Sequence, residues 1–455
     1  MGASFSFKYP PTQDHIAAVL GKKIYIIGGM QLFPEREKNR LHPLNEIFVI
    51  DTDTSQGKTD KAALRQEIRS TLPNTFGSGC AVAKQKIYLF GGGLNPAEKI
   101  PRYSNDLFCF DVNLTEWLGV SVKGEKPAGR SGLGMCTIGD QIVLFGGYGP
   151  QHDDSFRKRG FSWKQRRKGG EGGWNNELAV FDLKDPYEGV WKWPAEGRQL
   201  NWPLARTGHT LTPTKNRQIV LYGGNNWTGT LSDLHVLSAD TWTWTEVSGH
   251  ADCPMPAVSF HSATFVEGKS GIGLLLILGG KKEIKNETAV ESITVTEDTV
   301  IALDTGVSFS LSHPGIARSS HTVSQVPNSG DKPTTLYIHG GLDQDGNTTN
   351  KSQLLQWSAE CPTSLIHLKS FTSVVPTTHD PRSSEFQQKI IEKQQERIRK
   401  IQTGEEDKVT EATRSHTFPS VDKPQKRKQQ TDATEKKTNN LNRKNNECNT
   451  SDESL

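Results

Sequence analysis

A dense basic segment interrupts the chain between residues 157 and 168. Seven of its twelve residues are basic: Arg157, Lys158, Arg159, Lys164, Arg166, Arg167 and Lys168. Phe161 and Trp163 lie among them, and Trp174 follows. An arginine guanidinium presents a planar fork that binds both oxygens of a carboxylate, and aromatic neighbours exclude water from such a pair. The segment therefore points to an acidic peptide or a C-terminal carboxylate as ligand.

Two other interpretations of this segment stay open. A charge run of this density also occurs in solvated loops that bind nothing. Aromatic residues among basic residues also suit base stacking and phosphate contacts, so RNA is a rival ligand. The net charge of the whole chain is only +3, which does not favour a nucleic-acid function.

No residue pattern in the chain predicts catalysis. The sequence has no Gly-x-Ser-x-Gly turn, no phosphate-binding loop and no His-Glu-x-x-His motif. Its six cysteines form no Cys-x-x-Cys pair, so neither a zinc site nor a disulfide framework is expected. His209, His261 and His321 recur at one register of a repeat, which favours a structural role over metal binding. We expect a binding module without metal or cofactor, located in the cytoplasm, the nucleus or both.

The elements that position these residues come from six copies of one pattern. Each copy contains a four-residue apolar run that ends in a glycine pair: Gly28-Gly29, Gly91-Gly92, Gly146-Gly147, Gly223-Gly224, Gly279-Gly280 and Gly340-Gly341. Such a run is typical of a strand buried on both faces, and glycine allows the chain to turn sharply after it. The basic segment follows the third pair. It therefore lies in a loop between two strands of the third copy.

Each copy also has companion segments. Small residues and histidine precede the apolar run, as in Arg206-Thr207-Gly208-His209, and an alternating strand opened by an acidic or amide pair follows it, as in Asn176-Glu177. A tryptophan such as Trp117 closes most copies. We therefore expect four strands per copy. The copies lie near residues 13–60, 76–120, 130–194, 206–247, 258–312 and 318–372, within one domain of residues 1–372.

This pattern resembles the kelch repeat, over roughly residues 13 to 360. The resemblance implies an all-β, six-bladed kelch β-propeller, in which each blade packs against its neighbours. Blade 1 lacks its tryptophan, and blade 5 replaces the expected strand opening with the loose stretch Glu291 to Thr299. Either Phe5 to Lys8 or Leu365 to Leu368 supplies the outer strand of blade 6, and the sequence does not choose between them.

In a kelch propeller, the loop after the glycine pair and the loop that enters the inner strand open on the same face of the ring. Loops on a rigid scaffold are common binding sites. The resemblance therefore gathers the candidate ligand-binding residues around one mouth of the central channel. They are Tyr148, Arg157, Arg159, Trp163, Arg166, Arg167, Trp174, Arg130, Arg206, Asn225, Trp227, Ser259 and Arg318.

Blades 3 and 4 are most similar to the group of kelch domain-containing proteins 1, 2 and 10, which are substrate receptors of cullin-RING ubiquitin ligases. The matching segments are Phe145-Gly146-Gly147-Tyr148-Gly149, the basic insert, Gly173-Trp174-Asn175-Asn176, Asp233-Leu234-His235, Trp242-Thr243-Trp244 and Ser259-Phe260-His261-Ser262. That group captures a C-terminal glycine end with two arginines, a serine and a tryptophan. Ser259 and Trp174 match the serine and the tryptophan. The arginines have no match, because Asn225 to Thr230 follows the glycine pair.

The resemblance implies partners as well as a ligand. Receptors of this group bind the elongin adaptor, and through it a cullin, by a short helix. Pro362 to Lys369 resembles its start, although Lys369 stands where the group has a small residue. A ligase receptor that recognises acidic or C-terminal peptide ends is therefore one expectation. A non-enzymatic adaptor or scaffold, associated with actin or signalling proteins, is the alternative, and RNA binding is the least favoured.

The ends of the chain have a different character. Residues 373–455 are rich in Lys, Glu, Gln, Asn and Thr, and this composition is typical of a largely disordered tail. Within it, Ser384 to Gln402 has a helical pattern that suits either a solvated or a partner-binding helix, and Lys423 to Lys428 suits a nuclear-import patch or solvated charge. No stretch is apolar enough to span a membrane. Gly2 fits the permissive myristoylation pattern.

Overall fold

The structure of the protein is a computed structural model. The chain divides into two compact units, Met1–Pro376 and Thr377–Leu455. The structure describes residues 11–33, 40–44, 46–52, 63–69, 75–94, 102–150, 163–165, 172–194, 201–268, 271–285, 290–311, 316–326 and 333–372. All of them belong to the first unit. The helical segment expected at 384–402, the alternative closing strand at 5–8 and the myristoylation pattern at Gly2 lie outside these residues.

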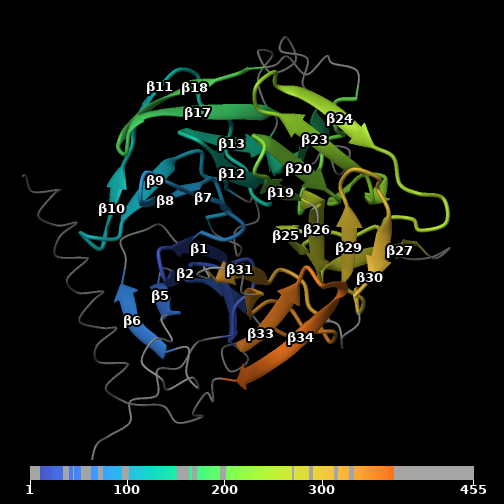
Figure 1. Ribbon diagram of the computed structural model, residues 1–455. Helices are drawn as coiled ribbons and strands as arrows, with labels where there is room; N and C mark the ends of the chain where they lie inside the picture. Colours follow the sequence, from blue (N-terminus) through green and yellow to red (C-terminus); the bar gives the residue numbers. More distant parts are fainter. Residues whose placement is uncertain are drawn as a thin grey trace, which may run out of the picture. The chain divides into compact units, whose positions relative to one another are not determined.

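The first unit is all-β and forms a six-bladed propeller (Figure 1). Each blade is an antiparallel sheet whose strands follow one another outward from the channel. Blade 1 contains β1 (Ile16–Leu20), β2 (Lys23–Ile27), β5 (Glu46–Asp51) and β6 (Ala63–Arg69). Blade 2 contains β7 (Gly79–Ala83), β8 (Lys86–Phe90), β9 (Leu107–Asp111) and β10 (Glu116–Gly119). Blade 3 contains β12 (Gly134–Ile138), β13 (Gln141–Phe145), β17 (Leu178–Asp185) and β18 (Glu188–Lys192).

The second half of the ring repeats this order. Blade 4 contains β19 (Thr210–Pro213), β20 (Gln218–Tyr222), β23 (Leu234–Ser238) and β24 (Thr243–Val247). Blade 5 contains β25 (Ser262–Glu267), β26 (Gly273–Leu278), β29 (Thr299–Ala302) and β30 (Ser308–Ser310). Blade 6 contains β31 (Thr322–Val326), β32 (Thr334–His339), β33 (Lys351–Ser358) and β34 (Cys361–Thr372). The inner strands β1, β7, β12, β19, β25 and β31 contact one another in a closed cycle (Figure 1).

Two features of the blades go beyond the repeat. Strand β11 (Ser121–Lys123) pairs in parallel with β18 and gives blade 3 a fifth, outermost strand. Strand β34 pairs with β33 and supplies the fourth strand of blade 6, which answers the question that the sequence left open. Residues Pro362 to Lys369 therefore belong to a strand, whereas an elongin contact of the expected kind needs a short helix.

Small sheets follow the glycine pairs of four blades. They are the hairpin β3 (Met30–Phe33) with β4 (Arg40–Pro43), the three-stranded sheet of β14 (Tyr148–Pro150), β16 (Gly172–Asn175) and β15 (Trp163–Gln165), the hairpin β21 (Asn225–Asn226) with β22 (Gly229–Thr230), and the hairpin β27 (Lys281–Lys285) with β28 (Val290–Thr294). Part of the loose stretch expected in blade 5 therefore forms β28. Residues of the last three of these sheets line one mouth of the channel.

The core lies between the blades rather than within them. The second strand of each blade is mostly apolar because both of its faces are covered: in β13, Ile142, Val143, Leu144 and Phe145 are fully buried. Each pair of neighbouring blades shares one cluster of buried apolar side chains, and the cluster around Ile24 and Tyr337 joins blade 1 to blade 6.

A ring of backbone hydrogen bonds encircles the channel. One residue from each blade donates its N–H to the carbonyl of the residue in the preceding blade, over distances of 2.7–3.2 Å. The six residues are Asp14, Gly77, Gly132, Gly208, Phe260 and Ser320, and all have positive φ. The bond from Asp14 to the Ser320 carbonyl closes the circle between the first and last blades.

Candidate functional site

A cavity of about 910 Å³ lies at the mouth of the channel. Its walls come from the segments that follow the glycine pairs of blades 2 to 5 and from the residues that enter the inner strands of all six blades. Backbone bridges hold the two sets together: Ser131 pairs with Tyr148, and Ser259 with Lys281. The expectation that these loops open on one face is confirmed.

Four aromatic side chains form a row along one side of the cavity. They are Tyr103, Tyr148, Trp174 and Trp227, from blades 2, 3, 3 and 4, with successive ring centroids 6.3, 5.6 and 6.3 Å apart in edge-to-face geometry. Strand pairing explains the central contact, because Tyr148 of β14 lies directly opposite Trp174 of β16. The row presents an apolar surface to a ligand and extends over three blades.

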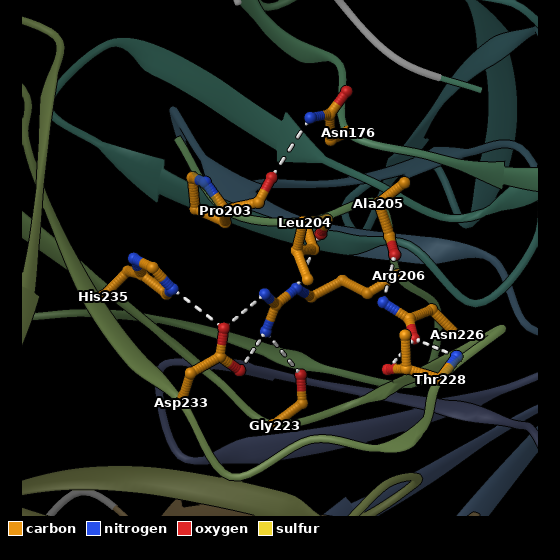
Figure 2. Close-up of polar contacts among 10 residues, drawn as sticks. All are labelled: Asn176, Pro203, Leu204, Ala205, Arg206, Gly223, Asn226, Thr228, Asp233 and His235. Carbon is orange, nitrogen blue, oxygen red and sulfur yellow. Dashed lines mark hydrogen bonds and ion pairs between the residues drawn. The ribbon is translucent and has the colours of Figure 1, made fainter. Parts of the chain in front are cut away.

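The two tryptophans of this row differ in exposure. Trp174 is 7% exposed, and its indole Nε1 has no hydrogen-bond partner among the described residues. Trp227 is 38% exposed at the tip of the β21–β22 hairpin. The Asn226 side chain shapes that tip, because its Oδ1 accepts hydrogen bonds from the Thr228 N–H at 2.8 Å and hydroxyl at 2.7 Å (Figure 2). Trp227 is thus held on an ordered turn with its ring accessible.

The charged side chains that line the described part of the cavity are Lys281, Glu283 and Asp14. Lys281 Nζ lies 4.5 Å from the ring centroid of Phe260. The Glu283 carboxylate accepts a hydrogen bond of 3.3 Å from the Asn225 amide. Burial raises the pKa of the Asp14 carboxyl, although Ser320 and Lys281 act in the opposite direction. The lining therefore carries both signs of charge.

Four largely buried histidines belong to the lining and are uncharged. They are His15, His209, His261 and His321, each about 5–6% exposed, and burial lowers their pKa. His209 Nε2 accepts a hydrogen bond of 3.2 Å from the Gly134 N–H, and His261 Nε2 lies 3.0 Å from the Thr210 hydroxyl. These bonds join neighbouring blades, which confirms the structural role expected for His209 and His261.

The three inner-strand arginines correct an expectation. Arg130, Arg206 and Arg318 were expected to face a ligand, but they are 0%, 0% and 4% exposed and do not line the cavity. Figure 2 shows Arg206 held by the Asp233 carboxylate, with both N–O distances 2.6 Å, and by the Leu204 and Gly223 carbonyls at 2.9 and 3.0 Å. Its guanidinium is fully engaged inside blade 4.

The other two arginines have the same arrangement. Arg130 pairs with Glu177, and Arg318 donates to Gln353 Oε1 at 2.8 Å. Each also donates to the carbonyl of the first glycine of its blade's pair, as Arg206 does. The physical reason is common to all three blades. The guanidinium satisfies polar groups where three strands of the blade meet, so it is not available to a ligand.

The remaining candidate residues have different positions relative to the cavity. Asn225 lines the cavity, whereas Ser259 is 1% exposed, lies outside the lining and donates its hydroxyl to the Lys281 carbonyl at 3.2 Å. The backbone of Trp163 lies in β15, opposite Asn175. The basic insert residues Arg157, Arg159, Arg166 and Arg167 lie outside the described residues.

Lys281, Glu283 and Tyr103 were not anticipated. Lys281 directly follows the fifth glycine pair, as Tyr148 follows the third. The register of the repeat could therefore have located it from the sequence. Tyr103 forms a bridge with Gly93, the residue after the second pair.

The kelch-repeat family model described as the KLHDC2/KLHL20/DRC7 Kelch-repeats domain matches residues 14–280. The chain belongs to this kelch-repeat family. It is 25% identical over 278 residues to Kelch domain-containing protein 2 of Bos taurus, covering 58% of this chain and 62% of that protein. It is 28% identical over 241 residues to Kelch domain-containing protein 1 of Homo sapiens, covering 50% and 54%. The match thus spans less than two thirds of each relative's length.

A solved structure shares the propeller fold. The structure of YjhT superposes with a TM-score of 0.57 at 14% sequence identity, over 80% of this chain and 99% of that one. Within the described residues, no group of three or more His, Cys, Asp and Glu side chains is arranged to hold a metal ion. The same part of the kelch propeller has no helix that is long and apolar enough to cross a membrane.

Proposed function

We propose that this kelch propeller is a protein-binding module that receives a peptide segment of its partner in the channel-mouth cavity. The observation that carries the proposal is the row Tyr103, Tyr148, Trp174 and Trp227 along one wall, opposite polar side chains on another part of the lining. Rigid aromatic side chains give a large contact area at low entropic cost and are common at the centre of protein interfaces. Loops on a ring of packed blades provide the rigid support.

The ligand group that we propose to lie beside Lys281 is a carboxylate, from an acidic side chain or from a C-terminus. Since Arg130, Arg206 and Arg318 are engaged inside their blades, Lys281 is the described cation that supports this proposal. RNA is less well supported, because phosphate binding usually uses several Lys and Arg side chains and Lys281 is the only one among the described residues of the lining.

Selection of random peptides on the full chain tests this proposal. Trp227→Ala should weaken binding of the selected peptides about tenfold, because truncation of a central aromatic contact commonly costs 1–2 kcal/mol or more. Phe309→Ala is the matched control, since Phe309 is 47% exposed but lies on β30 at the outer edge of blade 5. Binding that is insensitive to both Trp227→Ala and Trp174→Ala would place the ligand elsewhere.

A substrate receptor of a cullin-RING ubiquitin ligase is the specific role we propose for this module. Membership of the kelch-repeat family and similarity to Kelch domain-containing proteins 1 and 2 support it. Because Pro362 to Lys369 pairs with β33 as part of β34, the adaptor contact would have to use other residues.

Co-purification of the full chain with elongin and cullin subunits tests this role. We expect both subunits to associate with the wild type and equally with Trp227→Ala, because the cavity binds substrate rather than the ligase. An absence of association would contradict the receptor role. If peptides still bound the cavity, the result would support the adaptor or scaffold alternative.

A further inference from the structure

The β27–β28 hairpin has two different faces. Side chains alternate along β27, so that Lys281 and Glu283 are partly buried and line the cavity, whereas Lys282 and Ile284 are exposed on the other face. On β28, Ser292 is paired with Glu283 and shares the cavity lining, and Glu291 lies opposite Ile284. The hairpin therefore presents one cation and one anion to the cavity, two residues apart on a single strand.

Neither charge forms an ion pair within the described part of the chain. Lys281 lies over Phe260, and Glu283 has the neutral Asn225 amide as its hydrogen-bond partner. Asp14, the third charged residue of the lining, is partly buried, and Lys281 lowers the pKa of its carboxyl against the effect of burial, which raises it. A ligand that covers Lys281 and Glu283 is favoured if it supplies opposite charges, since burying a charged group without a partner is costly.

The spacing of the two charges matches an extended peptide. Alternate residues of a strand lie roughly 6.5–7 Å apart on one face, and the side chains of an extended ligand have the same period. Trp227 also lines the cavity, and an exposed indole favours the stem and the charge of a lysine or an arginine.

We propose that the cavity selects a peptide that carries an acidic group and a basic side chain two residues apart, with the acidic group at Lys281 and the basic group at Glu283. This inference rests on the proposed function and adds the charge pattern of the ligand. The acidic group is either a side-chain or a C-terminal carboxylate. Peptides with free and amidated ends distinguish these two sources.

The test uses the full chain and labelled synthetic peptides of one length. They carry acidic-x-basic, basic-x-acidic or uncharged triplets, each internally and at the C-terminus. The wild type should bind one of the two charged orders at least tenfold more tightly than the uncharged triplet, because each charge-assisted bond contributes enough for about tenfold. Lys281→Met and Glu283→Gln should each remove most of this preference. Lys282→Met and Glu291→Gln, which change the opposite face of the same hairpin, should leave it unchanged.

The double variant Lys281→Glu with Glu283→Lys should prefer the other order of charges. Equal binding of charged and uncharged triplets that still depends on Trp227 would overturn the charge pattern while the cavity remained the peptide site. The proposed charge pattern would also be overturned if the double variant kept the wild-type preference for one order of charges. If no peptide bound in a Trp227-dependent manner, both the charge pattern and the proposed function would fail.

Discussion

At the scale of single residues, buried arginines stabilise the blades. Arg206 connects the start of the inner strand, the glycine turn and the start of the third strand through Leu204, Gly223 and Asp233. Burial opposes ionisation of Asp233, yet hydrogen bonds from Arg206 and His235 hold the pKa of its carboxyl well below the usual range. The pair is therefore charged at neutral pH, and removal of one partner leaves the other uncompensated.

Arg206→Met should destabilise the protein by about 3–5 kcal/mol, the usual cost of breaking a buried ion pair by removing one partner. Urea unfolding at pH 7 measures the loss. Arg217→Met is the control, because Arg217 forms an exposed pair with Asp240 and its loss should cost less than about 1 kcal/mol. Wild-type stability in Arg206→Met, together with loss of peptide binding, would instead mean that this arginine contacts the ligand.

At the scale of elements, the backbone ring fixes how closely the inner strands approach. Three ring positions on adjacent blades are glycines, and the others carry the side chains of Asp14, Phe260 and Ser320. The aromatic row comes from the glycine-bearing blades 2, 3 and 4. Phe260 lies beneath Lys281 on the opposite half of the ring. The ring therefore contributes to the asymmetry of the cavity.

Gly132→Ala should be more destabilising than Gly21→Ala, although both residues have φ near +60°. A Cβ at Gly132 would lie 2.2 Å from Thr207 Oγ1, whereas a Cβ at Gly21 has no neighbour within 4 Å. Gly21→Ala should cost about 1–2 kcal/mol of backbone strain, and Gly132→Ala about 1–3 kcal/mol more from the steric conflict. If thermal unfolding showed the same loss of stability in both variants, the close contact between Gly132 and Thr207 across the blades would contribute nothing to the cost of Gly132→Ala.

At the scale of the whole molecule, histidines between blades link stability to pH. Burial lowers the pKa of His15 to about 4 and those of His209 and His261 to about 3. The folded state therefore binds fewer protons than the unfolded state below about pH 6.5. Their contribution to stability is complete above that pH and is lost as the pH falls toward 4.

Stability should thus fall as the pH decreases below about 6, by about 1 kcal/mol per pH unit for each buried histidine whose pKa is lowered. Asp14, whose pKa is raised by burial, opposes this trend. Urea midpoints at pH 7, 6 and 5 measure the slope. His261→Gln should make this slope less steep, because it removes one of the buried histidines. Constant stability from pH 7 to 5 would contradict the burial of these histidines in their neutral form.

The sequence predicted the six-bladed propeller because each copy of the repeat has an apolar run that ends in a glycine pair, where the backbone turns sharply. The same register placed Tyr148, Trp174, Asn225 and Trp227 on the channel face, and their role in binding stays a prediction. It misassigned Arg130, Arg206 and Arg318, since the partners that bury them lie up to 47 residues away in the chain. Arginine recurs at the same position of three repeats. This recurrence indicated a structural role for the arginines, just as it did for the histidines.

Fluorine NMR of the protein labelled with 5-fluorotryptophan tests the central claim most directly. The label reports on all ten tryptophans while a selected peptide is added. The Trp174 and Trp227 resonances should shift with the peptide concentration, whereas those of Trp191, Trp244 and Trp357 in the blade cores should remain in place. Saturable binding that leaves both the Trp174 and the Trp227 resonances unchanged would contradict a ligand site at the channel mouth.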